Sequence, residues 1–84
     1  MSIPSEVIVY STPLCAPCEQ LKRYLKAMGI SFMVKDLLMD EEAAELLESK
    51  NIHSAPALQV NGELYAGEQL APENIDALFG LQDN

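Results

Sequence analysis

Hydrophobic and polar residues follow patterns along this chain that predict four strands and three helices. A continuous apolar run predicts a strand over 7–10, and a partly alternating run predicts a second over 30–35. Two short runs joined by a tight turn predict strands over 57–60 and 63–65. Helices are expected where apolar residues recur at helical spacing: 15–28, 40–51 and 72–79. The predicted order is therefore β-α-β-α-β-β-α.

Residues with particular backbone preferences mark the ends of these elements. Asp40 is a good N-cap for the second helix, Pro72 suits the first turn of the third, and Gly29 suits the end of the first. Asn61-Gly62 is typical of a two-residue hairpin turn in which both residues need a positive φ. A strand–helix–strand unit followed by a hairpin and a helix predicts an α/β fold, with a mixed four-stranded sheet flanked by helices. We expect one domain over residues 1–84.

The chain has two cysteines, and they form a Cys-x-x-Cys motif, Cys15-Ala16-Pro17-Cys18, between the first strand and the first helix. A disulfide within so short a loop removes little entropy from the unfolded chain, so it would add little stability. The spacing therefore favours redox chemistry over a structural role. There are three alternatives. The cysteines could bind zinc together with further ligands, bridge an iron–sulfur cluster between two chains, or form an inert pair.

The position of the motif predicts different roles for the two sulfurs. Cys15 is expected at the helix N-cap, where unpaired backbone N–H groups and the helix dipole stabilise a thiolate. Pro17 has no N–H, so the N–H and thiol of Cys18 are the expected donors, with Lys22 and Arg23 adding positive charge. We expect Cys15 to attack a target disulfide and Cys18 to resolve the mixed disulfide.

The hydrophobic fraction and the net charge limit the kinds of partner that this protein can bind. Hydrophobic residues make up 49% of the chain, which is typical of a globular protein, and the net charge of −8 argues against nucleic acid. The charge favours partners with basic patches. No segment reaches the roughly 20 apolar residues of a membrane span, and because residues 1–6 contain neither a basic leader nor a long apolar stretch, we expect no signal peptide. We expect a cytoplasmic monomer that does not bind membranes.

Three segments resemble glutaredoxin-like members of the thioredoxin superfamily: Val9 to Cys18, the Ala55-Pro56 step, and Tyr65-Ala66-Gly67. The resemblance runs from about residue 7 to residue 79. It implies the thioredoxin fold in its short, glutaredoxin-like form and the activity of a dithiol–disulfide oxidoreductase.

The resemblance also implies a substrate groove. A proline at position 56 is usually cis in this fold and faces the dithiol, which leaves the Ala55 backbone free to pair with an extended substrate. The segment containing Gly67 and Glu68 is expected to form the far wall. The residues expected to bind substrate are Thr12, Pro13, Leu14, Ala16, Pro17, Ala55, Pro56, Gly67 and Glu68.

Within the superfamily, the chain is most similar to NrdH-redoxins, which accept electrons from thioredoxin reductase and reduce ribonucleotide reductase. Residues 65–72 correspond to the Trp-Ser-Gly-Phe-Arg-Pro segment of those proteins, with an aromatic residue, the glycine and the proline present and the Phe and Arg missing. Glutaredoxins usually carry a Lys where Thr12 stands, and Glu68 would repel the carboxylates of glutathione. We therefore favour thioredoxin reductase as the electron source and ribonucleotide reductase as the client, with glutathione as the alternative reductant. No tightly bound cofactor or metal is expected.

Several other residues permit two interpretations. His53 is either a base or a solvated loop residue, and Thr12 either touches substrate or belongs to an ordinary loop. The acidic run over 40–48 is either a solvated helix face or a docking site, and Pro56 could be an ordinary trans proline. The aromatic residues expected in the core are Tyr10, Tyr24 and Phe32.

Overall fold

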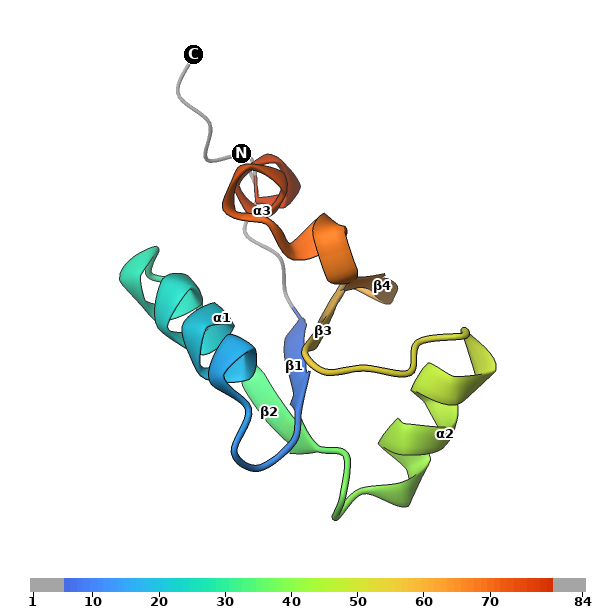
Figure 1. Ribbon diagram of the computed structural model, residues 1–84. Coiled ribbons are helices and arrows are strands. Elements are labelled where there is room, and N and C mark those ends of the chain that lie inside the picture. The colour runs from blue at the N-terminus through green and yellow to red at the C-terminus, as the bar shows by residue number, and fades with distance from the viewer. Residues whose placement is uncertain (1–5, 80–84) are drawn as a thin grey trace.

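A single mixed sheet organises the chain in the computed structural model, which describes residues 6–79 (Figure 1). The strands are β1 Val7–Ser11, β2 Met33–Asp36, β3 Ala57–Val60 and β4 Glu63–Ala66. The helices are α1 Ala16–Ala27, α2 Glu41–Ser49, α3 Pro72–Leu78 and a short 3-10 helix, η1 Gly67–Leu70. The sheet order is β2-β1-β3-β4; β2 is parallel to β1, and the other neighbouring pairs are antiparallel. The predicted element order is confirmed, and η1 is an addition to it.

The helices cover both faces of the sheet (Figure 1). Alternate residues of β1 point to opposite faces, so Val9 packs with α1 and α3, whereas Tyr10 packs with α2. The α1–α3 face buries Val7, Val9, Leu21, Leu25, Leu58, Val60, Ile75 and Phe79. The α2 face buries Ile8, Tyr10, Ala43, Leu47 and Ala57. Burial on both faces explains why β1 reads as a continuous apolar run.

The predicted second strand, 30–35, is wrong at its beginning. Gly29 has a φ of 76°, and the N–H of Ile30 donates to the carbonyl of Leu25 at 3.0 Å. These residues therefore close α1 in a Schellman-type C-cap and cannot also belong to a strand. β2 begins at Met33 instead, where it pairs with Ile8.

The predicted turn and cap residues are confirmed. Asp40 accepts the Ala43 N–H at 3.0 Å at the start of α2, and Pro72 is the first residue of α3. Asn61 and Gly62 have φ values of 49° and 94°, as the hairpin turn requires. None of the helices within residues 6–79 is long and apolar enough to cross a membrane.

Candidate active site

The two cysteines lie at the N-terminus of α1 and are joined in a disulfide, with their Cα atoms 5.2 Å apart. Cys15 is the N-cap residue, and its Sγ accepts the backbone N–H of Cys18 at 3.1 Å. Cys15 is half-buried, whereas Cys18 is fully buried. An incoming disulfide can therefore reach Cys15, and Cys18 is placed to attack from inside. The N–H donor is the one that the sequence analysis predicted.

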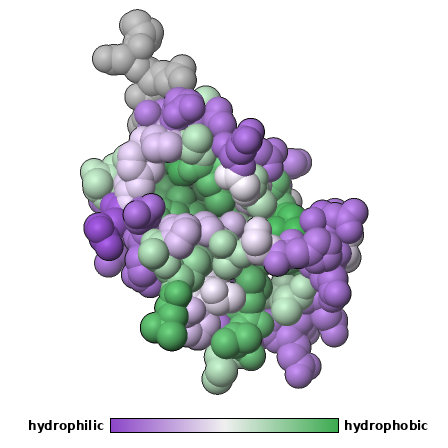
Figure 2. All heavy atoms as spheres, viewed as in Figure 1, coloured by the Kyte–Doolittle hydropathy of each residue, from purple (hydrophilic) through white to green (hydrophobic). Residues whose placement is uncertain are grey.

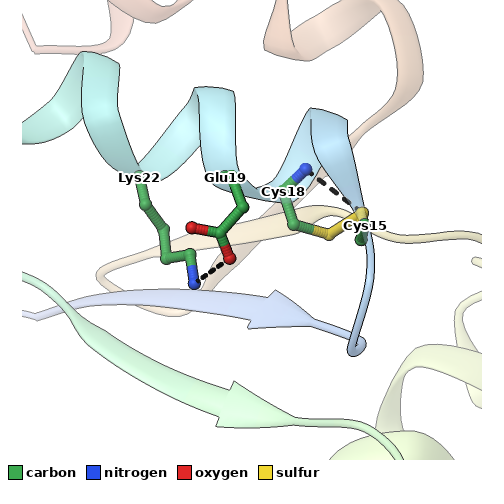
Figure 3. Close-up of a disulfide and its surroundings, with 4 residues drawn as sticks. All are labelled: Cys15, Cys18, Glu19 and Lys22. Carbon is green, nitrogen blue, oxygen red and sulfur yellow. Dashed lines mark hydrogen bonds and ion pairs between the residues drawn. A yellow bond between two sulfur atoms is a disulfide. The ribbon is translucent and has the colours of Figure 1, made fainter.

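One of the two positive side chains expected to act on this site, Lys22, is paired with a neighbouring carboxylate. Lys22 forms an ion pair with Glu19 at 2.8 Å, and Figure 3 shows its ammonium group held by the Glu19 carboxylate, further along α1 than the two sulfurs. The hydrogen bond from Lys22 also lowers the pKa of the Glu19 carboxyl. Because the Glu19 carboxylate offsets the charge of Lys22, the helix N-terminus and the Cys18 N–H are the groups that the structure places to stabilise negative charge on Cys15.

A groove of about 450 Å³ lies beside the dithiol, between α1, the loop before β3 and η1. In Figure 2 it is the mainly hydrophobic hollow between α1 and the segment formed by η1 and α3. Its lining residues are Pro17, Gln20, Leu21, Tyr24, Ser54, Ala55, Pro56, Gly67, Glu68, Leu70, Ala71, Pro72 and Ile75. Five of the predicted substrate-binding residues are thus brought together, although their part in substrate binding stays a prediction.

Two backbone features shape this groove. The Ala55–Pro56 peptide bond is cis, as the resemblance implies. Within residues 6–79, no backbone or side-chain group hydrogen-bonds to the Ala55 N–H or carbonyl. Those groups are therefore open to an extended segment that enters the groove, as in strand addition.

The other predicted binding residues lie elsewhere around the sulfurs. Thr12 lines a second, smaller hollow of about 240 Å³, which it shares with Ala55 and His53. Pro13 and Leu14 are exposed in the β1–α1 loop, and Ala16 is exposed in the first turn of α1. Their contact with substrate remains untested, as does a basic role for His53. No cluster of three or more metal-ligating residues occurs within residues 6–79.

Tyr24 is a groove residue that the sequence analysis assigned to the core. It is half-buried, and its hydroxyl donates to Asp76 of α3 at 2.6 Å. This hydrogen bond raises the pKa of the Tyr24 phenol. The helical spacing of Tyr24 gave the correct face of α1, but it could not show that this part of the face is left open beside α3. Tyr10 is in the core, as predicted.

Similarity to known proteins agrees with this geometry. The family model described as Glutaredoxin matches residues 7–65. A relative from Clostridium pasteurianum, described as an uncharacterized glutaredoxin-like 8.6 kDa protein in the rubredoxin operon, is 32% identical over 72 residues. That match covers 84% of this chain and 93% of the relative.

Solved structures show the same fold. The thioredoxin-like protein BC3987 is 31% identical with a TM-score of 0.71, and the match covers 92% of this chain and 100% of that one. NrdH-redoxin from Escherichia coli has a TM-score of 0.77 at 23% identity, over 87% of this chain and 93% of its own. The predicted thioredoxin-like fold is therefore confirmed. Because the family match extends over most of the chain and includes the Cys-x-x-Cys pair, the chain belongs to the glutaredoxin family.

Proposed function

We propose that this protein is a dithiol–disulfide oxidoreductase that reduces disulfides in other proteins. The observation that carries the proposal is the unequal placement of the two sulfurs. Cys15 is half-buried at a helix N-cap beside a groove, and Cys18 is fully buried one turn inside the helix. A structural disulfide would not need one accessible sulfur next to a groove in which the Ala55 backbone is left without a hydrogen-bond partner among residues 6–79.

The reaction begins with the reduced protein. The Cys15 thiolate attacks one sulfur of the client disulfide, which forms a Cys15–client mixed disulfide and releases the other client sulfur as a thiolate. Cys18, after losing its proton, then attacks the Cys15 sulfur and releases the second client thiolate. Two electrons pass to the client, its two thiolates take up protons from solution, and the Cys15–Cys18 disulfide remains. An external reductant must restore the dithiol.

Thioredoxin reductase is the reductant that we propose. The groove contains one charged lining residue, Glu68, and it is negative. Glutathione carries two carboxylates, so Glu68 opposes its binding, and Thr12 offers no positive charge to compensate. Ribonucleotide reductase is the proposed client, on the resemblance to NrdH-redoxins, and a reducing cytoplasm is the proposed location.

A reductant-pairing assay tests this proposal. Insulin reduction is followed with NADPH and either thioredoxin reductase, or glutathione with glutathione reductase. We expect turnover with the first system and little with the second. The Glu68→Lys variant should gain activity with glutathione, whereas Glu63→Lys, on the exposed end of the hairpin, should not. Efficient turnover of the unmodified protein by glutathione would contradict the choice of reductant.

A further inference from the structure

Three large apolar side chains are strongly exposed in two loops: the β1–α1 loop, which leads into Cys15, and the β2–α2 loop, which begins beside the end of β1. Leu14 in the β1–α1 loop is 105% exposed, and Leu38 and Met39 in the β2–α2 loop are 71% and 82% exposed. We call these three residues the loop patch. Removing apolar side chains from water is favourable. A group of exposed ones near the Cys15–Cys18 pair therefore indicates a surface that contacts another molecule.

The two loops follow the carboxyl ends of β1 and β2, at the same end of the sheet. β1 and β2 are parallel, with Ser11 paired to Asp36, and the Leu37 N–H donates to the Ser11 carbonyl at 2.8 Å. The Leu38 N–H donates to the Asp36 carboxylate at 2.9 Å, which holds the turn that presents Leu38. In Figure 2 two hydrophobic protrusions stand next to each other at the lower edge, where Figure 1 places these loops. The residues of the loop patch are therefore held next to one another by the backbone of the two loops.

Leu14 has no evident role in folding. Its side chain lies outside the core, and its φ of 56° is in the left-handed region, which is unfavourable for a leucine. Glycine or asparagine would suit this backbone better and lose no packing. An exposed leucine in a strained conformation directly before Cys15 is better explained by contact with a partner.

The charge next to the loop patch is negative. Met39 is followed by Asp40, and the exposed Glu41 and Glu42 begin α2. The right-hand side of Figure 2, where Figure 1 places α2, is mainly hydrophilic. Of the five basic residues of the chain, Lys22, Arg23 and Lys26 lie on α1 and Lys50 caps the far end of α2. Lys35 on β2 precedes the β2–α2 loop, but the three carboxylates at the start of α2 outnumber it. A complementary partner therefore offers an apolar side chain with basic residues around it.

We propose that the loop patch, with the acidic start of α2, docks a client protein whose reactive disulfide is flanked by an apolar residue and by Lys or Arg. This inference rests on the proposed function and adds the class of client sequence to it. The patch lies outside the groove, which is lined by other residues. A client would contact the protein at the groove and at the patch, with Cys15 between them.

Synthetic peptides test the proposal without needing a known client. Each peptide carries one cysteine as a mixed disulfide with 4-thiopyridine, and the reduced protein releases 4-thiopyridone, which is followed by its ultraviolet absorbance. The cysteine is flanked by Leu and two Lys, by Leu and two Glu, or by Ser and two Lys. Each rate is divided by the rate with 4,4′-dithiodipyridine, a small neutral disulfide. We expect the Leu–Lys peptide to give the highest ratio, by about 10-fold over the Leu–Glu peptide at low salt, and this preference should shrink at high salt.

Variants separate the two parts of the surface. The double variant Leu38→Ser/Met39→Ser should remove the preference for Leu over Ser. Glu41→Lys/Glu42→Lys should reverse the preference between the Lys and Glu peptides. The matched control is Met33→Ser/Val34→Thr, which changes exposed apolar residues on β2 and should leave every ratio unchanged.

Two negative results have different meanings. Equal ratios for all three peptides, or an equal effect of the control variant, would overturn the docking proposal while leaving disulfide exchange intact. Failure of the reduced protein to react with 4,4′-dithiodipyridine would instead contradict the proposed function itself.

Discussion

At Leu14, the backbone adopts a conformation that disfavours leucine, one residue before the attacking sulfur. A left-handed conformation costs an L-residue with a Cβ roughly 1–2 kcal/mol, and glycine avoids this cost. The Cys15–Cys18 disulfide likewise adds little to the stability of the fold, because the loop that it closes is short. Residues next to the dithiol thus contribute little to stability, which agrees with the proposed exchange and docking roles.

Replacement of Leu14 tests this account of strain. We expect Leu14→Gly to be more stable than Leu14→Ala by about 1 kcal/mol, since alanine keeps the Cβ and glycine does not. Urea unfolding of the two variants, both with the disulfide formed, measures the difference. An alanine variant as stable as the glycine variant would show that the backbone at this position is not strained.

Between elements, the Tyr24–Asp76 hydrogen bond joins α1 to α3 at the wall of the groove. It raises the pKa of the phenol above the value near 10 that it has in the unfolded chain. At pH values between the unfolded and folded pKa, the folded protein keeps a proton that the unfolded chain has lost. Stability from this bond is therefore complete below pH 10 and falls as the pH rises through the folded pKa.

The Tyr24→Phe variant isolates this effect. We expect it to be less stable than the unmodified protein at pH 8, and the difference should disappear as the pH rises through the folded pKa. Chemical unfolding at a series of alkaline pH values measures it. The pKa of Tyr10 is also raised, mainly by burial, but Tyr10 is present in both proteins and cancels in the comparison. A difference that is constant with pH would show that the hydrogen bond does not act through titration.

For the whole molecule, local sequence signals predicted what depends on neighbouring residues. The apolar run at Val7, the Asn61 turn and the Asp40 cap each reflect a backbone or burial preference that few other residues satisfy. The start of β2 was missed because Gly29 and Ile30 complete a helix cap, which apolar alternation alone does not reveal. η1 was missed because its segment carries no helical pattern of apolar residues.

In the candidate site, too, some features follow from local sequence and others depend on how distant elements pack. Cys15 and Cys18 stand out from spacing alone, and the wall at Gly67 follows from the resemblance. The openness of the groove at Tyr24 depends on how α3 packs beside α1, which no local pattern encodes. The closeness of the β1–α1 and β2–α2 loops likewise depends on the parallel pairing of β1 and β2, which places both loops at the same end of the sheet.

The central claim is that Cys15 attacks and Cys18 resolves, and trapping tests it most directly. The reduced Cys18→Ser variant is mixed with a disulfide-bonded peptide, and the products are analysed by mass spectrometry after digestion. We predict a stable adduct in which the peptide is bonded to Cys15, whereas the Cys15→Ser variant forms little adduct because Cys18 is buried. An adduct on Cys18 formed as readily as the one on Cys15, or full insulin reduction by the Cys15→Ser variant, would contradict the account.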